Sequence, residues 1–302
     1  MNRSRRALSL YAALFAAFGT GCGGGGALLH PAHVLPEAKL SAGAGVSGQF
    51  TFGRGARAID AGRAAADPRS SGDPEAAFVE GAISSSSLAP GVAPWVGARV
   101  GLGGNNEGGL TYTGRTARVD ARHAFSDDTY ALSIGLGASG VLMHPPERDS
   151  VTGGGATAGR FKAGADAFDA TGWGLDVPVL LGVRSSASIV EAWVGVRGGV
   201  ERITGHLALA ESSLQGAMGG VIQVSEGDLP VYADASALRA YGGGLVGAAI
   251  GLSPFSVALE LDVAYQSVSG RAVIPDRAGG GEYRATLSGV TVSPAGAIIG
   301  KF

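Results

Sequence analysis

The histidines of this chain are the side chains best suited to acid–base or nucleophilic catalysis. The five are His30, His33, His123, His144 and His206. We expect the first two, in a glycine-rich segment, to be mobile and at the surface, and the third to lie on the apolar face of a strand. The last two lie in long loops near possible partners, which are Glu147 and Asp149 for one and Glu211 and Ser212 for the other. A catalytic base needs a nucleophile within hydrogen-bond reach. The sequence places no nucleophile at a spacing that would bring it next to either histidine, so each loop would have to fold into a site. We therefore expect no enzyme, and a hydrolase is the least favoured of three hypotheses.

Other motifs for metal, cofactor or nucleic-acid chemistry are missing from the sequence. The single cysteine, Cys22, gives neither a zinc signature nor a disulfide framework. The glycine runs at 153–155 and 242–244 lack the Lys-Ser or Lys-Thr pair of a phosphate-binding loop. A formal net charge of −2 without a basic cluster argues against nucleic acid. We expect no metal, no cofactor and no nucleic-acid partner.

A second set of ionisable residues stands at alternate positions of strand-like segments and could line the inside of a barrel. The set is Lys39, Arg99, Glu107, Arg118, Asp120, Arg122, Asp176, Arg184, Glu191, Arg197, Glu201, Glu260, Asp262 and Lys301. Basic and acidic residues are equally numerous, whereas an ion-selective constriction tends to carry one sign of charge. Buried charges need partners, so we expect these residues to pair with one another. This favours a closed or narrowly conducting barrel over a general porin.

The segments that carry these residues have apolar side chains at every second position, which is the pattern of a half-buried strand. They are 39–51, 95–102, 107–114, 116–125, 129–141, 171–184, 189–202, 240–252, 255–268 and 290–302. The load of 53 glycines and the 16% of charged residues also argue against a soluble helical domain. Most connections alternate between short turns and long loops. We expect a short helix in the loop 54–90, where Asp73 and Pro74 could start it, and consider a weaker helix at 234–241.

The amino end reads as an export signal. Arg3, Arg5 and Arg6 precede an apolar run that is too short to span a bilayer as a helix. The sequence up to Cys22 resembles a bacterial lipoprotein box, although Gly19 stands where that family usually has Leu. The resemblance implies that residues 1–21 are removed and that Cys22 is acylated; an ordinary signal peptide is the alternative. We expect residues 22–37 to form a glycine-rich periplasmic tether.

The carboxyl end, an alternating strand that finishes on Phe302, resembles the sorting signal of bacterial outer-membrane β-barrel proteins. Those barrels have short periplasmic turns and longer extracellular loops. The resemblance implies an all-β fold, a transmembrane antiparallel up-and-down barrel over residues 38–302. We expect about ten strands, with eight or twelve as alternatives. It also implies a place in the cell outer membrane, contact with outer-membrane lipid, and insertion by the barrel-assembly machinery through the C-terminal strand.

The aromatic residues indicate which face meets lipid. On the apolar face they gather at strand ends and predict two girdles, made of Phe50, Tyr112, Trp173 and Tyr265 near the long loops and Phe125, Tyr130, Phe255 and Phe302 near the short turns. Phe255 and Tyr265 are ten residues apart on one strand. This separation corresponds to about 25 Å of height at a tilt of roughly 40°. That is the thickness of an outer-membrane apolar band, so the apolar face is expected to point outward.

The function that we infer from the sequence is passive or narrow small-solute transport. The alternative is a structural or surface-interaction barrel that presents the long loops 54–90 and 204–236. Nothing in the sequence names a solute or a partner.

Overall fold

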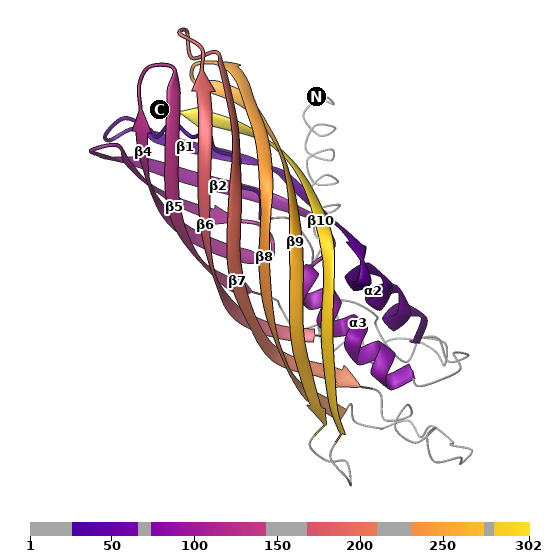
Figure 1. Cartoon of the computed structure of the whole chain (residues 1–302). Coiled ribbons are helices and arrows are strands. Elements are labelled where there is room, and N and C mark those ends of the chain that lie inside the picture. The colour runs from indigo at the N-terminus through magenta and orange to yellow at the C-terminus, as the bar shows by residue number, and fades with distance from the viewer. Residues whose placement is uncertain (1–25, 66–73, 143–167, 210–230, 275–280) are drawn as a thin grey trace, which may run out of the picture.

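The described residues form a closed antiparallel barrel of ten strands with two helices (Figure 1). The computed structural model describes residues 26–65, 74–142, 168–209, 231–274 and 281–302. The strands are β1 (Leu40–Gly53), β2 (Gly91–Gly103), β3 (Asn106–Tyr112), β4 (Thr116–Ser126), β5 (Tyr130–Leu142), β6 (Phe168–Arg184), β7 (Val190–Leu209), β8 (Val231–Leu252), β9 (Phe255–Ile274) and β10 (Gly281–Lys301), and the helices are α2 (Arg54–Ala65) and α3 (Pro74–Leu88). The expected all-β up-and-down barrel of ten strands is confirmed.

The barrel closes where the first strand pairs with the last. Ser41 lies opposite Lys301, and the backbone groups of Leu40 and Phe302 exchange two hydrogen bonds of 2.8 and 3.0 Å. The ring of paired strands is therefore closed, which is the arrangement that a chain crossing lipid by strands requires. The helices of the described part are too short or too polar to cross a membrane themselves.

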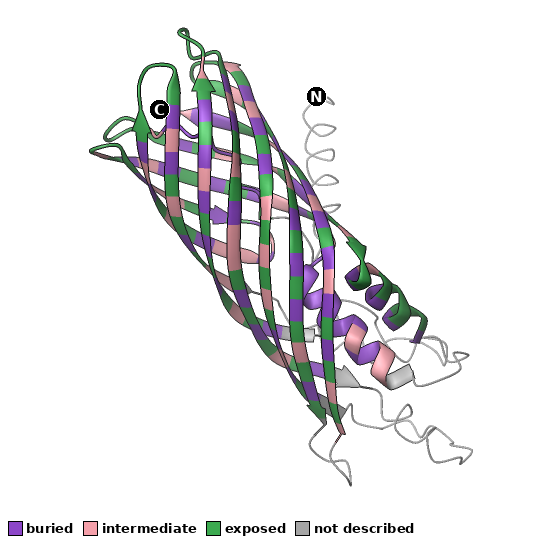
Figure 2. Ribbon diagram, viewed as in Figure 1, coloured by how far each residue is buried: buried purple, intermediate pink, exposed green. Residues whose placement is uncertain are grey.

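In the half of the barrel with short turns, the outer wall is apolar, and the charged side chains lie on the inner wall together with a few apolar ones such as Trp95. Along β9, Val257, Leu259 and Val263 are exposed on the outer wall, whereas Glu260 and Gln266 are buried inside. Figure 2 shows this alternation of exposed and buried residues on the long strands. A soluble barrel would have the opposite arrangement, with apolar residues packed inside, so this wall is one that meets lipid.

The strands on one side of the barrel are longer than those on the other. β1 to β5 have at most 14 residues, whereas β6 to β10 have 17 to 22. β7 and β8 therefore extend into the sequence 204–236 that we had expected to be a loop, and 234–241 is strand rather than helix. The loop expectation is wrong over 204–209 and 231–236 because cross-strand pairing continues past the apolar band.

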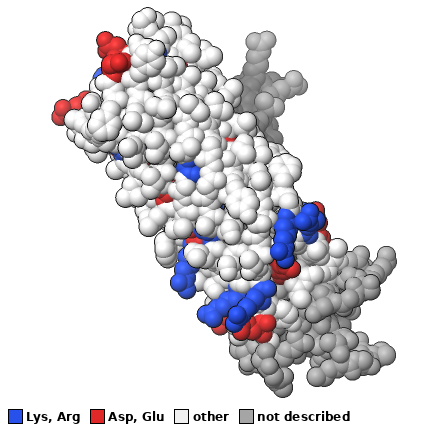
Figure 3. Space-filling model, in the orientation of Figure 1, with Lys and Arg blue, Asp and Glu red and all other residues white. Residues whose placement is uncertain are grey.

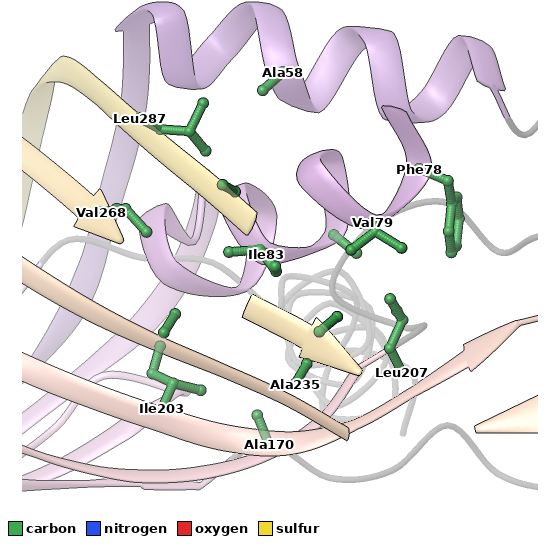
Figure 4. Close-up of a cluster of buried hydrophobic side chains, with 14 of the residues drawn as sticks. Ala58, Phe78, Val79, Ile83, Ala170, Ile203, Leu207, Ala235, Val268 and Leu287 are labelled. Atoms are coloured by element: carbon green, nitrogen blue, oxygen red, sulfur yellow. The ribbon is translucent and has the colours of Figure 1, made fainter. Parts of the chain in front are cut away.

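Helix α3 covers the inner face of this extended wall, and α2 packs on α3 next to β1 and β10. The expected helix in the loop 54–90 is present as α3, and α2 precedes it. Figure 4 shows Phe78, Val79 and Ile83 of α3 among side chains of the strands, including Leu207 and Leu287. The inner wall is apolar at this end, and α3 keeps it from water.

Helix α2 packs on α3 through small residues. Its buried positions are Gly55, Ala58, Ile59, Gly62 and Ala65, a spacing that gives one apolar face. A Cβ added at Gly62 would lie 2.8 Å from the Cα of Gly81 in α3. The contact therefore requires two glycines, and α2 leaves its arginines on the opposite, exposed face.

Residues 26–37, which we call the plug segment, lie inside the barrel at the end with the short turns. Ala27, Leu28, Leu29 and Ala32 are buried against lumen side chains such as Trp95. The expectation of a periplasmic tether is therefore wrong over these residues. The physical reason is their composition, since GALLHPAHVL carries enough apolar surface to pack inside a barrel whose lumen offers hydrogen-bond partners.

Candidate functional site in the barrel lumen

The deep end of the plug segment is held by one carboxylate of β9. Glu260 accepts the backbone N–H of Leu28 at 2.7 Å and that of Leu29 at 3.0 Å. It also accepts the indole N–H of Trp193 at 3.1 Å, and its side chain is buried. A second indole, Trp95, donates to the carbonyl of Ala27 at 3.1 Å. N–H donors rather than a cation thus surround this carboxylate among the described residues.

The remainder of the plug segment is fixed by two charged residues of the opposite wall. Arg122 of β4 donates to the ring of His30 at 2.9 Å, to the carbonyl of His33 at 3.1 Å and to the carbonyl of Pro31. Glu107 of β3 accepts the backbone N–H of Leu35 at 2.7 Å. The peptide groups of the segment are therefore satisfied by barrel side chains in place of a sheet, as buried backbone requires.

A continuous chain of ion pairs runs along the inner wall from β2 to β7. Arg99 pairs with Glu107 and, at 2.6 Å, with Asp120. Arg118 joins Asp120 to Asp176 at 2.9 Å, and Arg197 pairs with Asp176 at 2.7 Å. These side chains come from β2, β3, β4, β6 and β7, and all are at most 9% exposed. The balanced charges predicted to pair do so here.

The pair between Arg118 and Asp176 passes over β5, and a glycine makes this possible. Gly137 lies opposite Asp120 on one side and Asp176 on the other. A Cβ added at Gly137 would be 2.3 Å from a nitrogen of Arg118 and 2.3 Å from an oxygen of Asp176. The absent side chain leaves the space through which β4 and β6 connect.

A second ion-pair group lies nearer the helices and ties them to the barrel. Glu201 of β7 pairs with Arg115 at 2.6 Å and with Arg239 at 3.2 Å. Arg239 also donates to the carbonyl of Ser87 in the last turn of α3 at 2.8 Å. A cation at a helix carboxyl end is favourable, so this arginine links the lumen network to α3.

The other predicted lumen residues lie near the short-turn rim or beside the network. Lys301 pairs with Glu191 at 2.7 Å and is 39% exposed. Arg184 and Asp262 are partly exposed, and Lys39 is exposed just before β1 rather than enclosed in the lumen. The eight aromatic residues proposed for the girdles are all exposed on the outer wall, with Phe255 and Phe302 in edge-to-face contact at 6.4 Å.

Three of the five histidines take positions different from those expected, and His123 lies on the outer face of β4 as expected. His30 and His33 are 3% and 5% exposed, so the expectation of mobile surface residues is wrong for both. His206 lies on β7 rather than in a loop, and its ring is 2.9 Å from the carboxylate of Asp234. His123 contacts Asn106 at 3.0 Å and the ring of Phe125. His144, Cys22 and the export signal lie outside the described residues.

Two hollows accompany this arrangement. A cavity of about 250 Å³ lies between the plug segment and the short-turn rim, lined by residues that include His33, Arg184 and Lys301. A larger hollow of about 750 Å³ is lined mainly by outer-wall residues such as Tyr130 and Leu181. The larger hollow lies on the wall that faces lipid and is lined mainly by apolar side chains. The smaller cavity is therefore the one that belongs to the candidate site in the lumen.

The sequence did not identify Arg115, Arg239 and the plug segment as parts of the site. Arg115 stands in a tight turn, where strand parity gives no direction. Arg239 lies two residues before Tyr241 and therefore points to the same, inner side of β8 once this strand is extended toward its beginning. The parity of the sequence could have identified it. The apolar residues of the plug segment were the clue to its burial, but alternation does not report on irregular backbone.

Comparisons with known proteins place this chain in no family. No family model and no curated protein matches the chain. Among solved structures, Neisserial surface protein A has 10% sequence identity and a TM-score of 0.29, over 87% of this chain and 96% of that one. A major outer membrane protein from Thermus thermophilus has 11% identity and a TM-score of 0.34, over 88% and 99% of the two chains. Ail of Yersinia pestis has 8% identity and a TM-score of 0.26, over 88% and 99%.

Proposed function

We propose that this protein is an outer-membrane barrel that is closed at rest and serves as a structural or surface-presenting element. The observation that supports this most is the filling of the lumen at three levels. The plug segment lies in the short-turn end, the ion-pair chain from Glu107 to Arg197 lines half of the inner wall in the middle, and α3 covers the inner wall at the other end. A general porin needs open water along its axis.

The outer-membrane location rests on the geometry of the wall. An exposed apolar band bordered by aromatic residues, short turns at one end and long connections at the other are the features of such barrels. The end with helices α2 and α3 then faces the outside of the cell, and the C-terminal strand is the segment that assembly machinery would engage.

Single-channel recording in planar bilayers tests the closed state. Purified, folded protein is expected to insert without steady conductance, because the plug segment packs against the lumen side chains at the short-turn end. A stable ohmic conductance in most insertions would overturn the proposal. Heat-modifiable gel mobility confirms that the barrel is folded before each recording.

Gated small-solute transport is the second candidate, and the plug segment is the observation that favours it. The segment is not a strand of the barrel, and polar contacts to Glu260, Arg122 and Glu107 hold it. Deletion of residues 26–36 tests this role. Conductance that appears only in the deletion variant would support a gate, and silence in both proteins would leave the structural role.

The same proposal assigns no enzyme activity. His206 and Asp234 form a pair on the outer wall, where the side chains are 62% and 69% exposed and the described residues form no enclosed site around them. Replacement of His206 by Ala is expected to leave lipid and peptide profiles of the envelope unchanged, and a change in either would argue for a hydrolase.

A further inference from the structure

Residues that lie opposite one another on β7 to β10 form rows across the outer wall. Above the apolar band, successive rows differ in the polarity and charge of their side chains. The register places Tyr265 beside Val290 in one row near the upper edge of this band. Further toward the helices, one row consists of Arg202, Leu238, Ser269 and Thr286, and the next row consists of Thr204, Ser236, Arg271 and Arg284. We call the second of these the arginine row. The first acids, Asp234 and Glu282, appear only in the row beyond it.

The arginine row offers hydrogen-bond donors along a line across four strands. Neighbouring strands are about 4.8 Å apart, so the row is about 14 Å long. Arg271 and Arg284 lie directly opposite each other and both are exposed. Like charges in this position repel, and an anion between them would remove the repulsion. Hydroxyl groups of Thr204 and Ser236 continue the row.

Two other features give the same surface a positive character. Arg202 lies beside Trp173 of the outer girdle, at the height where an amphipathic boundary with lipid is expected. Helix α2, which packs against β1 and β10, leaves Arg54, Arg57 and Arg63 exposed. Figure 3 shows basic side chains gathered toward the end of the barrel that carries the helices, next to a largely uncharged middle zone.

We propose that the arginine row binds the phosphorylated sugar headgroup of a glycolipid in the outer leaflet. Guanidinium groups bind phosphate through paired, charge-assisted hydrogen bonds. The hydroxyl side chains of Ser269, Thr286, Thr204 and Ser236 match the hydroxyl groups of a sugar, and the apolar band below takes the acyl chains. The inference rests on the proposed outer-membrane location, but not on whether the lumen conducts.

Glu282 limits the present affinity of the row. Its carboxylate accepts hydrogen bonds from Arg284 at 3.0 and 3.4 Å, so it competes with a phosphate for the same guanidinium. Glu282→Gln removes the competing charge without removing a donor. This variant is therefore expected to bind a phosphorylated glycolipid at least as tightly as the native protein.

Native mass spectrometry of the folded protein in detergent tests the proposal. The probe is an acylated glucosamine disaccharide with two phosphates, compared with the same lipid without phosphates and with phosphatidylglycerol. We expect the double variant R271Q/R284Q to lower affinity for the phosphorylated glycolipid about tenfold or more. The double variant K39Q/R184Q, which removes two positive charges at the opposite end, is the matched control and is expected to bind normally.

Several results would overturn the proposal. Unchanged affinity of R271Q/R284Q, equal binding of the lipid without phosphates, or weaker binding by Glu282→Gln would each contradict it. Phosphatidylglycerol bound as tightly as the glycolipid would show that the sugar is not recognised. If R271Q/R284Q fails the gel-mobility test for folding, R271K/R284K replaces it and is expected to lose part of the affinity, because lysine keeps the charge but not the paired donors. Retention of full affinity by the lysine variant would contradict a role for those paired donors.

Discussion

Replacement of Glu260 by Gln is expected to release the plug segment from the lumen. Glu260 accepts two backbone N–H groups, from Leu28 and Leu29, one on each carboxylate oxygen. Gln has one oxygen and places an NH₂ group in the other position, where it faces an N–H donor. One of the two hydrogen bonds is therefore lost, and the other loses its charge assistance.

The magnitude follows from these two contacts. Hydrogen bonds to a charged group contribute about 1.5–3 kcal/mol each, and a neutral one contributes about 0.5–1.5 kcal/mol. The variant therefore loses about 2–5 kcal/mol of plug docking. Relief of the buried charge offsets part of this loss, so the lower end, about 2 kcal/mol, is the expected value. Since about 1.4 kcal/mol is a tenfold change, the open fraction of the plug segment rises about 30-fold.

Hydrogen exchange measured by mass spectrometry reads this opening directly. The peptide covering residues 26–36 is expected to exchange about 30-fold faster in Glu260→Gln, while peptides of β7 to β9 keep their rates. Asp262→Asn is the matched control, because it neutralises the next inward carboxylate of β9, which has no hydrogen bond to the described plug segment. Exchange at the rate of an unstructured peptide in the native protein, or equal acceleration by both variants, would refute the reasoning.

Two further substitutions test the glycine contacts. Gly137→Ala is expected to separate the arginine–aspartate pair that crosses β5 and lower barrel stability by about 3 kcal/mol, the scale for a broken buried pair; urea unfolding followed by gel mobility measures it. Gly140→Ala on the same strand, where an added Cβ meets nothing within 4 Å, is expected to have little effect, and equal losses would contradict the account. Gly62→Leu is expected to separate α2 from α3 and to make α3 sensitive to protease. Ala64→Leu, on the exposed face of α2, is the control and is expected to leave α3 resistant. Equal sensitivity of the two variants would argue against the glycine contact.

The sequence was sufficient to predict the barrel and its outer wall. Alternation fixes which side chains share a face, and lipid permits only apolar residues on one of them. Leu259 and Val263 could therefore be placed outside, and Glu260 inside, from their parity alone. The same reasoning predicted that opposite charges inside would pair, but not that Arg118 would reach Asp176 across β5, because that contact depends on a glycine of the intervening strand.

The plug segment could not be predicted from periodicity. Its residues adopt irregular backbone, and their partners lie far along the chain, such as Glu260 for Leu28. The helix-bearing end was also missed in part, since Ala235 and Leu287 lie outside the strands expected at 240–252 and 290–302, yet both belong to longer strands and face inward. At that end the strands extend past the apolar band. Their inner wall carries apolar side chains, which α3 covers.

A disulfide cross-link tests most directly whether the plug segment occupies the lumen. The Cβ of Ala32 would lie 2.8 Å from a Cβ added at Gly182 of β6. In a Cys22→Ser background, mild oxidation of the pair A32C and G182C in membranes is expected to form an intramolecular cross-link, detected by peptide mass spectrometry. The pair A32C and G140C, with the second cysteine on the outer wall, should remain reduced. Absence of the first cross-link, or equal yields from both pairs, would contradict the account.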